Sequence, residues 1–98
     1  MTIQKVNEDL TSASHPVAKV LHKGKDNRVL VIGFKKGMIL KEHQAHLPSK
    51  LTVLSGEVIY EQDERNEVLC FFDEVEIPVN ITHSVEAVED SLCLLTQG

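Results

Sequence analysis

The chain has 98 residues, of which 42% are apolar and 26% charged, as expected of one compact globular domain rather than a disordered chain. Its formal net charge of −5 argues against binding to a nucleic-acid backbone, because such binding needs a concentrated face of Lys and Arg. A membrane partner is not expected either, since the longest strongly apolar run, residues 29–34, is far shorter than the roughly 20 residues that span a bilayer.

The amino-terminal segment, residues 1–16, is mostly polar. It reaches Glu8 and Asp9 before any apolar run, which is not the pattern of a signal peptide. We therefore predict a cytoplasmic protein in which this segment forms an extra edge strand or an arm beside the main domain.

From residue 17 onward, turn-forming residues interrupt the chain about every 8–12 residues, a spacing typical of a many-stranded β domain. Residues 23–27 and 62–67 are predicted to form exposed hairpins, and Ser55-Gly56 a tight turn in which glycine adopts a positive φ. The segments between the turns are rich in the residues that strands prefer. In chain order, strands are predicted for residues 17–23, 28–34, 38–43, 50–56, 57–62, 67–72, 74–78, 81–88 and 91–97.

The cysteine and aromatic side chains are predicted to be buried. Cys70 and Cys93 stand inside apolar runs, without the CxxC spacing of a zinc or redox site, so reduced core thiols are expected. The aromatic residues expected in the core are Phe34, Tyr60, Phe71 and Phe72.

Alternation of apolar and polar side chains is clearest over residues 81–87. Successive residues of a strand point to opposite faces, so His83 shares a face with the apolar residues Ile81, Val85 and Ala87. His83 is therefore predicted to point toward the apolar side of its strand.

The spacing of Gly37, His43 and Gly56 resembles the first motif of the cupin family. That motif runs glycine, five residues, histidine, one residue, a second histidine, and later a glutamate and a further glycine. Pro78 and His83 match two positions of the second cupin motif. The similarity covers roughly residues 29–96, and the chain resembles a small single-domain cupin of the RmlC-like type.

The resemblance implies an all-β fold, the double-stranded β-helix or jelly-roll barrel. Residues 1–98 would form one domain, with the barrel over about 29–96, and the protein would be a homodimer. It also implies that the barrel interior holds a divalent ion such as Zn, Ni, Mn or Fe on three His and one Glu. Imidazole and carboxylate groups suit such ions, and open coordination positions leave room for a substrate.

The sequence departs from both cupin motifs. The second histidine position falls on Ala45 and the glutamate position on Ser49, while His46 is offset by one residue. In a regular strand His46 would face away from His43, and only a bulge or a bend before Pro48 would turn it inward. In the second motif, Phe72 and Asn80 stand at glycine positions and Ala87 at an asparagine position.

Three interpretations of the histidines remain open. In the first, His43, His46 and His83 form a weak metal site completed by Gln44 or water. In the second, His43 and His83 line a metal-free pocket for a small organic ligand. In the third they are core or rim residues. The pocket residues predicted beside them are Gln44, Ser49 and Lys50, although the charge of Lys50 would repel a cation at close range.

We therefore predict a small-molecule-binding cupin whose cofactor is a weakly held divalent metal or none. The alternative is a metal-dependent enzyme of the dioxygenase, isomerase or decarboxylase type acting on a small oxygen-rich substrate. The fold does not decide between these functions, and the sequence assigns no catalytic residue. The incomplete set of metal ligands favours small-molecule binding over catalysis, because a catalytic metal usually needs three protein ligands.

Overall fold

The computed structural model describes the backbone of residues 1–98 and the side chains of residues 1–41 and 44–98. One helix, α1 (Thr2–Leu10), precedes the strands. The strands are β1 (Val17–Lys23), β2 (Arg28–Phe34), β3 (Ile39–His43), β4 (Ser49–Ser55), β5 (Glu57–Gln62), β6 (Arg65–Cys70), β7 (Glu74–Ile77), β8 (His83–Ala87) and β9 (Ser91–Gln97). The predicted succession of strands from residue 17 onward is confirmed.

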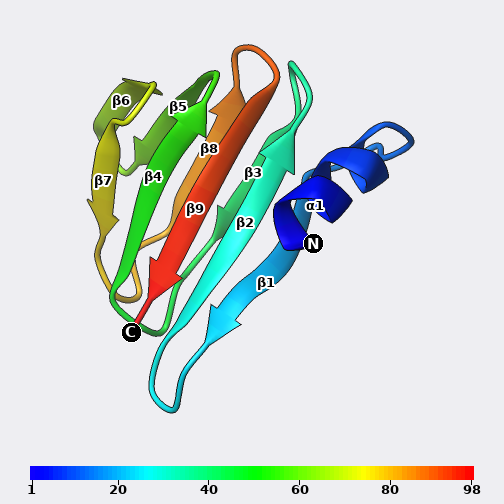
Figure 1. Ribbon diagram of the computed structural model, residues 1–98. Coiled ribbons are helices and arrows are strands. Elements are labelled where there is room, and N and C mark those ends of the chain that lie inside the picture. Colours follow the sequence, from blue (N-terminus) through cyan, green and yellow to red (C-terminus); the bar gives the residue numbers. More distant parts are fainter.

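The strands form two sheets that face each other (Figure 1). The first has the order β1-β2-β9-β4-β7 and the second the order β3-β8-β5-β6, with every neighbouring pair antiparallel. Strands far apart in the sequence therefore lie side by side, as β2 and β9 do in Figure 1. This arrangement is a jelly-roll, and the predicted all-β fold class is confirmed.

The core lies between the two sheets because alternate residues of each strand point inward. In β4 the buried residues are Ser49, Leu51 and Val53, and in β8 they include His83 and Val85. The prediction that His83 shares the apolar face of its strand is confirmed. The core cluster consists of Ile32, Phe34, Leu51, Val53, Val58, Tyr60, Leu69, Val75, Ile77, Val85, Ala87, Cys93 and Leu95.

The amino-terminal segment differs from the extra strand or arm that we predicted, because residues 2–10 form helix α1. Ile3, Val6 and Leu10 are spaced by three and four residues, which places them on one face of a helix. Val6 and Leu10 are buried against the outer face of β1 and β2. A side chain at Gly33 would lie 2.7 Å from Cγ1 of Val6, so glycine is what lets the helix pack this closely on β2.

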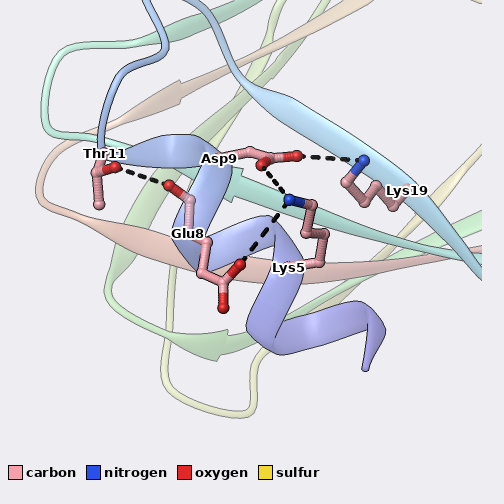
Figure 2. Close-up of polar contacts among 5 residues, drawn as sticks. All are labelled: Lys5, Glu8, Asp9, Thr11 and Lys19. Atoms are coloured by element: carbon pink, nitrogen blue, oxygen red, sulfur yellow. Dashed lines mark hydrogen bonds and ion pairs between the residues drawn. The ribbon is translucent and has the colours of Figure 1, made fainter.

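Charged side chains tie α1 to the sheet (Figure 2). Lys5 Nζ lies 3.3 Å from Asp9 Oδ1 within the helix, and Lys19 Nζ of β1 lies 3.2 Å from Asp9 Oδ2. Lys19, followed by Lys5, holds the pKa of the Asp9 carboxyl below its ordinary value. The helix is therefore fixed to β1 by Asp9 as well as by its apolar face.

The prediction that Cys70, Phe71 and Phe72 are core residues is wrong, whereas Phe34, Tyr60 and Cys93 are buried as predicted. Strand β6 lies at the edge of its sheet and directs Leu69 inward, so the next residue points outward. Phe71 and Phe72 then occupy the turn to β7, where their stacked rings, with centroids 3.7 Å apart, are 63% and 68% exposed.

The predicted tight turn at Ser55-Gly56 is confirmed, and Gly56 has φ +86°. Phe72 and Asn80, which stand at the glycine positions of the second cupin motif, also have positive φ values of +69° and +61°. The chain therefore keeps the backbone conformation that glycine favours at both positions although the residue has changed. In the described part of the chain, no helix has the length and apolar character needed to span a membrane.

Candidate ligand-binding site

His83 begins β8 and is only 3% exposed. Its Nδ1 lies 3.1 Å from the carbonyl oxygen of Ile81. A carbonyl can only accept a hydrogen bond, so Nδ1 carries the proton and Nε2 carries the lone pair in the neutral ring. This is the tautomer in which Nε2 can accept a hydrogen bond or bind a cation.

Tyr60 of β5 packs beside His83, with ring centroids 5.9 Å apart and planes inclined by 28°. The Tyr60 hydroxyl donates a 2.7 Å hydrogen bond to Oε1 of Gln62, and burial raises the pKa of that hydroxyl. The two rings therefore meet at the inner face of the sheet, with the polar end of Tyr60 satisfied by its neighbour.

The register of β3 and β8 sets the backbone of His43 directly opposite that of His83, forty positions along the chain. The pairing shifts between Leu40 and His43, so an irregularity lies just before the predicted ligand. The side chain of His43 lies outside the described residues, as does that of Glu42. The structure therefore sets the backbones of residues 43 and 83 opposite each other. That their side chains share a cavity stays a prediction.

His46 and Gln44 belong to the loop between β3 and β4 and are exposed. Nδ1 of His46 lies 3.3 Å from Oδ1 of Asn80, and Gln44 donates to the Thr82 hydroxyl at 3.2 Å. The backbone N–H of Asn80 also donates to the carbonyl of Ala45 at 2.8 Å. These contacts hold residues 44–46 against the loop between β7 and β8.

Ser49 and Lys50 point to opposite faces of β4. Ser49 is buried, and its hydroxyl donates to the carbonyl of Leu47 at 2.9 Å. Lys50 is half-buried and lies 3.6 Å from Glu74 of β7. The Lys50 charge therefore lies on the outer face of the sheet. At the inner face it would have repelled a bound cation.

The predicted site residues line three different hollows. His83 lines a polar hollow of about 330 Å³ together with Gln62. Ser49 and Lys50 border a second hollow of about 420 Å³. Gln44 and His46 line a third, of about 460 Å³, between the first sheet and the β3–β4 loop. Of the predicted residues whose side chains are described, only those of the same loop or strand share a hollow.

The described side chains fall short of the ligand set that the cupin resemblance implies. No group of three or more His, Cys, Asp or Glu suited to a metal ion occurs among the residues whose side chains are described. Ala45 and Ser49 occupy the remaining ligand positions of the first motif, and Ser49 uses its hydroxyl on the backbone. The described residues therefore do not fit a firmly held four-ligand ion.

The third hollow has a layered construction, and we call it the mouth cavity. Strands β2 and β9 pair Ile32 with Cys93, Leu30 with Leu95, and Arg28 with Gln97 along the face that points inward. The pairs thus change from core to apolar floor to polar rim toward the end of the sandwich where β9 finishes (Figure 1). The described lining residues are Ala18, Arg28, Leu30, Ile32, Leu40, Gln44, Ala45, His46, Leu47, Leu95 and Gln97.

The sequence analysis did not identify Arg28, Leu30, Leu95 or Gln97 as site residues. Strand alternation over residues 28–34 does place Arg28 and Leu30 on one face. The partner strand is β9, more than sixty residues later, and its register supplies Leu95 and Gln97. The site could therefore be located only after the long-range strand pairing was known.

Two facing antiparallel sheets in this order, closed around an apolar core with a cavity at one end, define a double-stranded β-helix. Solved structures with this fold include a cupin superfamily protein from Desulfitobacterium hafniense (TM-score 0.80, 15% identity, covering 86% of this chain and 77% of that one). An RmlC-like cupin from Shewanella frigidimarina has a TM-score of 0.80 and 19% identity, covering 88% of this chain and 78% of that one. The chain has the RmlC-like cupin fold, as the motif resemblance predicts.

A third structure is the cupin 2 conserved barrel domain protein from Leptotrichia buccalis, with a TM-score of 0.79 and 29% identity. The match covers 88% of this chain and 42% of that one, so the shared barrel is less than half of the longer protein. No protein-family model and no curated protein matches the sequence. The comparisons therefore define the fold, and the function must be argued from the site.

Proposed function

We propose that the protein binds a small molecule in the mouth cavity. The observation that carries this proposal is the cavity itself, whose volume of about 460 Å³ falls in the range of small-ligand sites. Its floor is apolar, formed in part by Leu30, Leu40 and Leu95, while Arg28 and His46 belong to a polar rim. Such a combination buries the body of a ligand and orients its polar end.

The proposal can be tested by NMR with a library of small fragments. Binding should shift the methyl signals of Leu30, Leu40 and Leu95 together. Ala18 lines the cavity and is exposed on β1, so Ala18→Trp should block the mouth and abolish these shifts. Lys23→Trp adds the same ring at an exposed position of β1 that does not line the cavity, and should leave them unchanged. Fragments that still shift the three leucines in Ala18→Trp would refute the site.

We also propose a second candidate, a weakly held divalent ion near His43 and His83. Support comes from the backbone pairing of these residues and from the Nδ1 of His83, which faces the carbonyl of Ile81, so that Nε2 is the ring nitrogen whose lone pair could bind an ion. An ion of the Zn, Ni, Mn or Fe type would act as a Lewis acid when bound, as the alternative enzymatic function requires. No step is assigned to it, because the described side chains supply too few ligands.

Elemental analysis of protein supplied with each ion in turn tests this candidate. His43→Gln and His83→Gln should each abolish binding, His46→Gln tests a third ligand, and the exposed His22→Gln is the matched control. A metal content near zero after supplementation would remove the metal and, with it, the metal-dependent form of the enzyme.

A homodimer is also proposed. β1 and β3 are edge strands of the two sheets and expose Val20, Leu21 and Ile39, and such edges readily pair with another chain. Light scattering at micromolar concentration should give twice the monomer mass of 11.0 kDa, and Leu21→Glu should restore the monomer. A wild-type mass of 11.0 kDa would contradict the dimer.

A further inference from the structure

The rim of the mouth cavity carries a positive charge in a protein whose formal net charge is −5. Arg28 is the charged residue among the described residues that line the cavity. Its Nε donates a 2.7 Å hydrogen bond to Oε1 of Gln97, the residue directly opposite it on β9. That bond orients the planar guanidinium and leaves the Nη1 and Nη2 groups for another acceptor.

No carboxylate among the described residues forms an ion pair with Arg28. A surface arginine without a binding role needs no defined orientation. An arginine that stabilises the fold is expected to pair with a carboxylate. Here a neutral amide holds the guanidinium in place, and no carboxylate of residues 1–41 or 44–98 pairs with its charge. Such an arrangement suits an anion that comes from outside the protein.

The apolar floor begins two residues along each strand from the Arg28–Gln97 pair. Leu30 and Leu95 form the next inward pair after Arg28 and Gln97, and Leu40 faces them across the cavity. A ligand that fills the cavity therefore needs a charged end at the rim and an apolar body within a few ångströms of it. Gln44 and His46 on the opposite rim add polar groups that can complete the contacts of the charged end.

From this geometry we infer that the ligand is a small organic monocarboxylate with an apolar body, its carboxylate bound by the forked Nη groups of Arg28. This inference rests on the proposed small-molecule function of the mouth cavity. A carboxylate matches the guanidinium in a bidentate manner. A phosphate ester would carry about twice the charge, for which the described rim offers a single formal cation.

Three six-carbon probes separate the contributions of charge and apolar body: hexanoate, 1-hexanol and hexylammonium. Methyl NMR titrations should show hexanoate shifting Leu30, Leu40 and Leu95 and binding more tightly than hexanol, with hexylammonium weakest. Arg28→Gln should weaken hexanoate binding by about 5- to 30-fold and leave hexanol unchanged, as expected for a charged hydrogen bond from an exposed residue of the rim. Arg28→Lys keeps the charge but loses the fork, and should fall between the two.

Lys25→Gln is the matched control, because it removes the same charge three positions away at an exposed turn residue that does not line the cavity. It should leave hexanoate binding within about twofold of wild type, since exposed charges beyond contact range are screened. Equal affinity for hexanoate and hexanol, or equal losses in Arg28→Gln and Lys25→Gln, would overturn the anion inference while leaving the cavity as a binding site. Failure of all three probes, and of the fragment library, to shift the three leucines would overturn the proposed function as well.

Discussion

The amide of Phe72 donates a 2.8 Å hydrogen bond to the carbonyl of Val53, while Phe72 itself is held at φ +69°. The bond anchors the turn between β6 and β7 to β4, and it fixes a bulky residue in the left-handed region. That region costs an L-residue about 1–2 kcal/mol, a cost that glycine avoids. Phe72 therefore adopts a left-handed backbone conformation that a bulky L-residue disfavours.

Two substitutions at Phe72 isolate the backbone effect, because both remove the ring and its stacking on Phe71. We predict that Phe72→Gly is more stable than Phe72→Ala by about 1 kcal/mol, measured by urea unfolding. At Phe71, which does not have a positive φ, the order should reverse, with Gly less stable than Ala by about 0.5–1 kcal/mol. The same order at both positions would show that the left-handed conformation of Phe72 is not strained.

Gly37 and Gly56 give a second matched comparison, because both have φ +86° but differ in their surroundings. A Cβ at Gly37 has nothing within 4 Å, whereas a Cβ at Gly56 would collide with Asp90 and lie 2.7 Å from Cα of Ser91. Gly56→Ala should therefore lose about 1–3 kcal/mol more stability than Gly37→Ala, since backbone atoms cannot move aside as a flexible side chain can. Equal losses in thermal unfolding would mean that the turn before β5 relaxes freely.

The succession of strands along the chain and much of the core could be predicted because their signals are local. Turn residues and the two-residue alternation are visible in any short window, and they placed His83 on the buried face of β8. The helix was also encoded locally, by the spacing of Ile3, Val6 and Leu10, but the strand-like character of the rest of the chain outweighed a nine-residue signal. Phe71 and Phe72 show the opposite error, because apolar composition alone does not reveal that β6 ends at an exposed sheet edge.

The candidate site could be predicted only in part, because its residues are brought together by tertiary contacts. The position of His46 depends on a loop held by Asn80, thirty-four residues away. The rim of the mouth cavity depends on the pairing of Arg28 with Gln97, sixty-nine residues away. Spacing within one motif carries no information about either contact. The family resemblance predicts that His43 and His83 share the barrel interior, and the backbone register of β3 and β8 sets the two residues opposite each other, while the His43 side chain lies outside the described residues.

Helix α1 is attached to the sheet by apolar packing and by ion pairs, and two substitutions separate these contributions to stability. Val6→Ala removes two buried methyl groups between α1 and β2 and should cost about 1–2.5 kcal/mol in urea unfolding. Asp9→Asn breaks the contacts with Lys5 and Lys19, but these ion pairs remain accessible to solvent, with the Asp9 side chain 35% exposed, so its effect should be smaller. Because the pKa of Asp9 is lowered in the folded protein, its contribution is present above 3.8 and is lost as the pH falls further. A larger loss for Asp9→Asn than for Val6→Ala at neutral pH would contradict this order.

Cys93 gives the chain an alkaline limit to its stability. The thiol lies in the core between the sheets, and burial raises its pKa from 9.0 to about 12. Between these values the unfolded chain has lost the thiol proton while the folded protein retains it, so the free energy of unfolding falls as the pH rises. The slope from this one group can reach about 1.4 kcal/mol per pH unit.

The measurement compares Cys93 with Cys93→Ala, both in a Cys70→Ala background so that one thiol is tested at a time. Cys93→Ala should be less stable at neutral pH because it leaves a small cavity, but its stability should decline less steeply above pH 9. Tyr60, whose pKa is also raised by burial, is present in both proteins, so its contribution cancels in the difference. Parallel curves for the two variants between pH 9 and pH 11 would mean that the Cys93 thiolate is tolerated in the core, and that water reaches a residue with no measurable exposure in the folded chain.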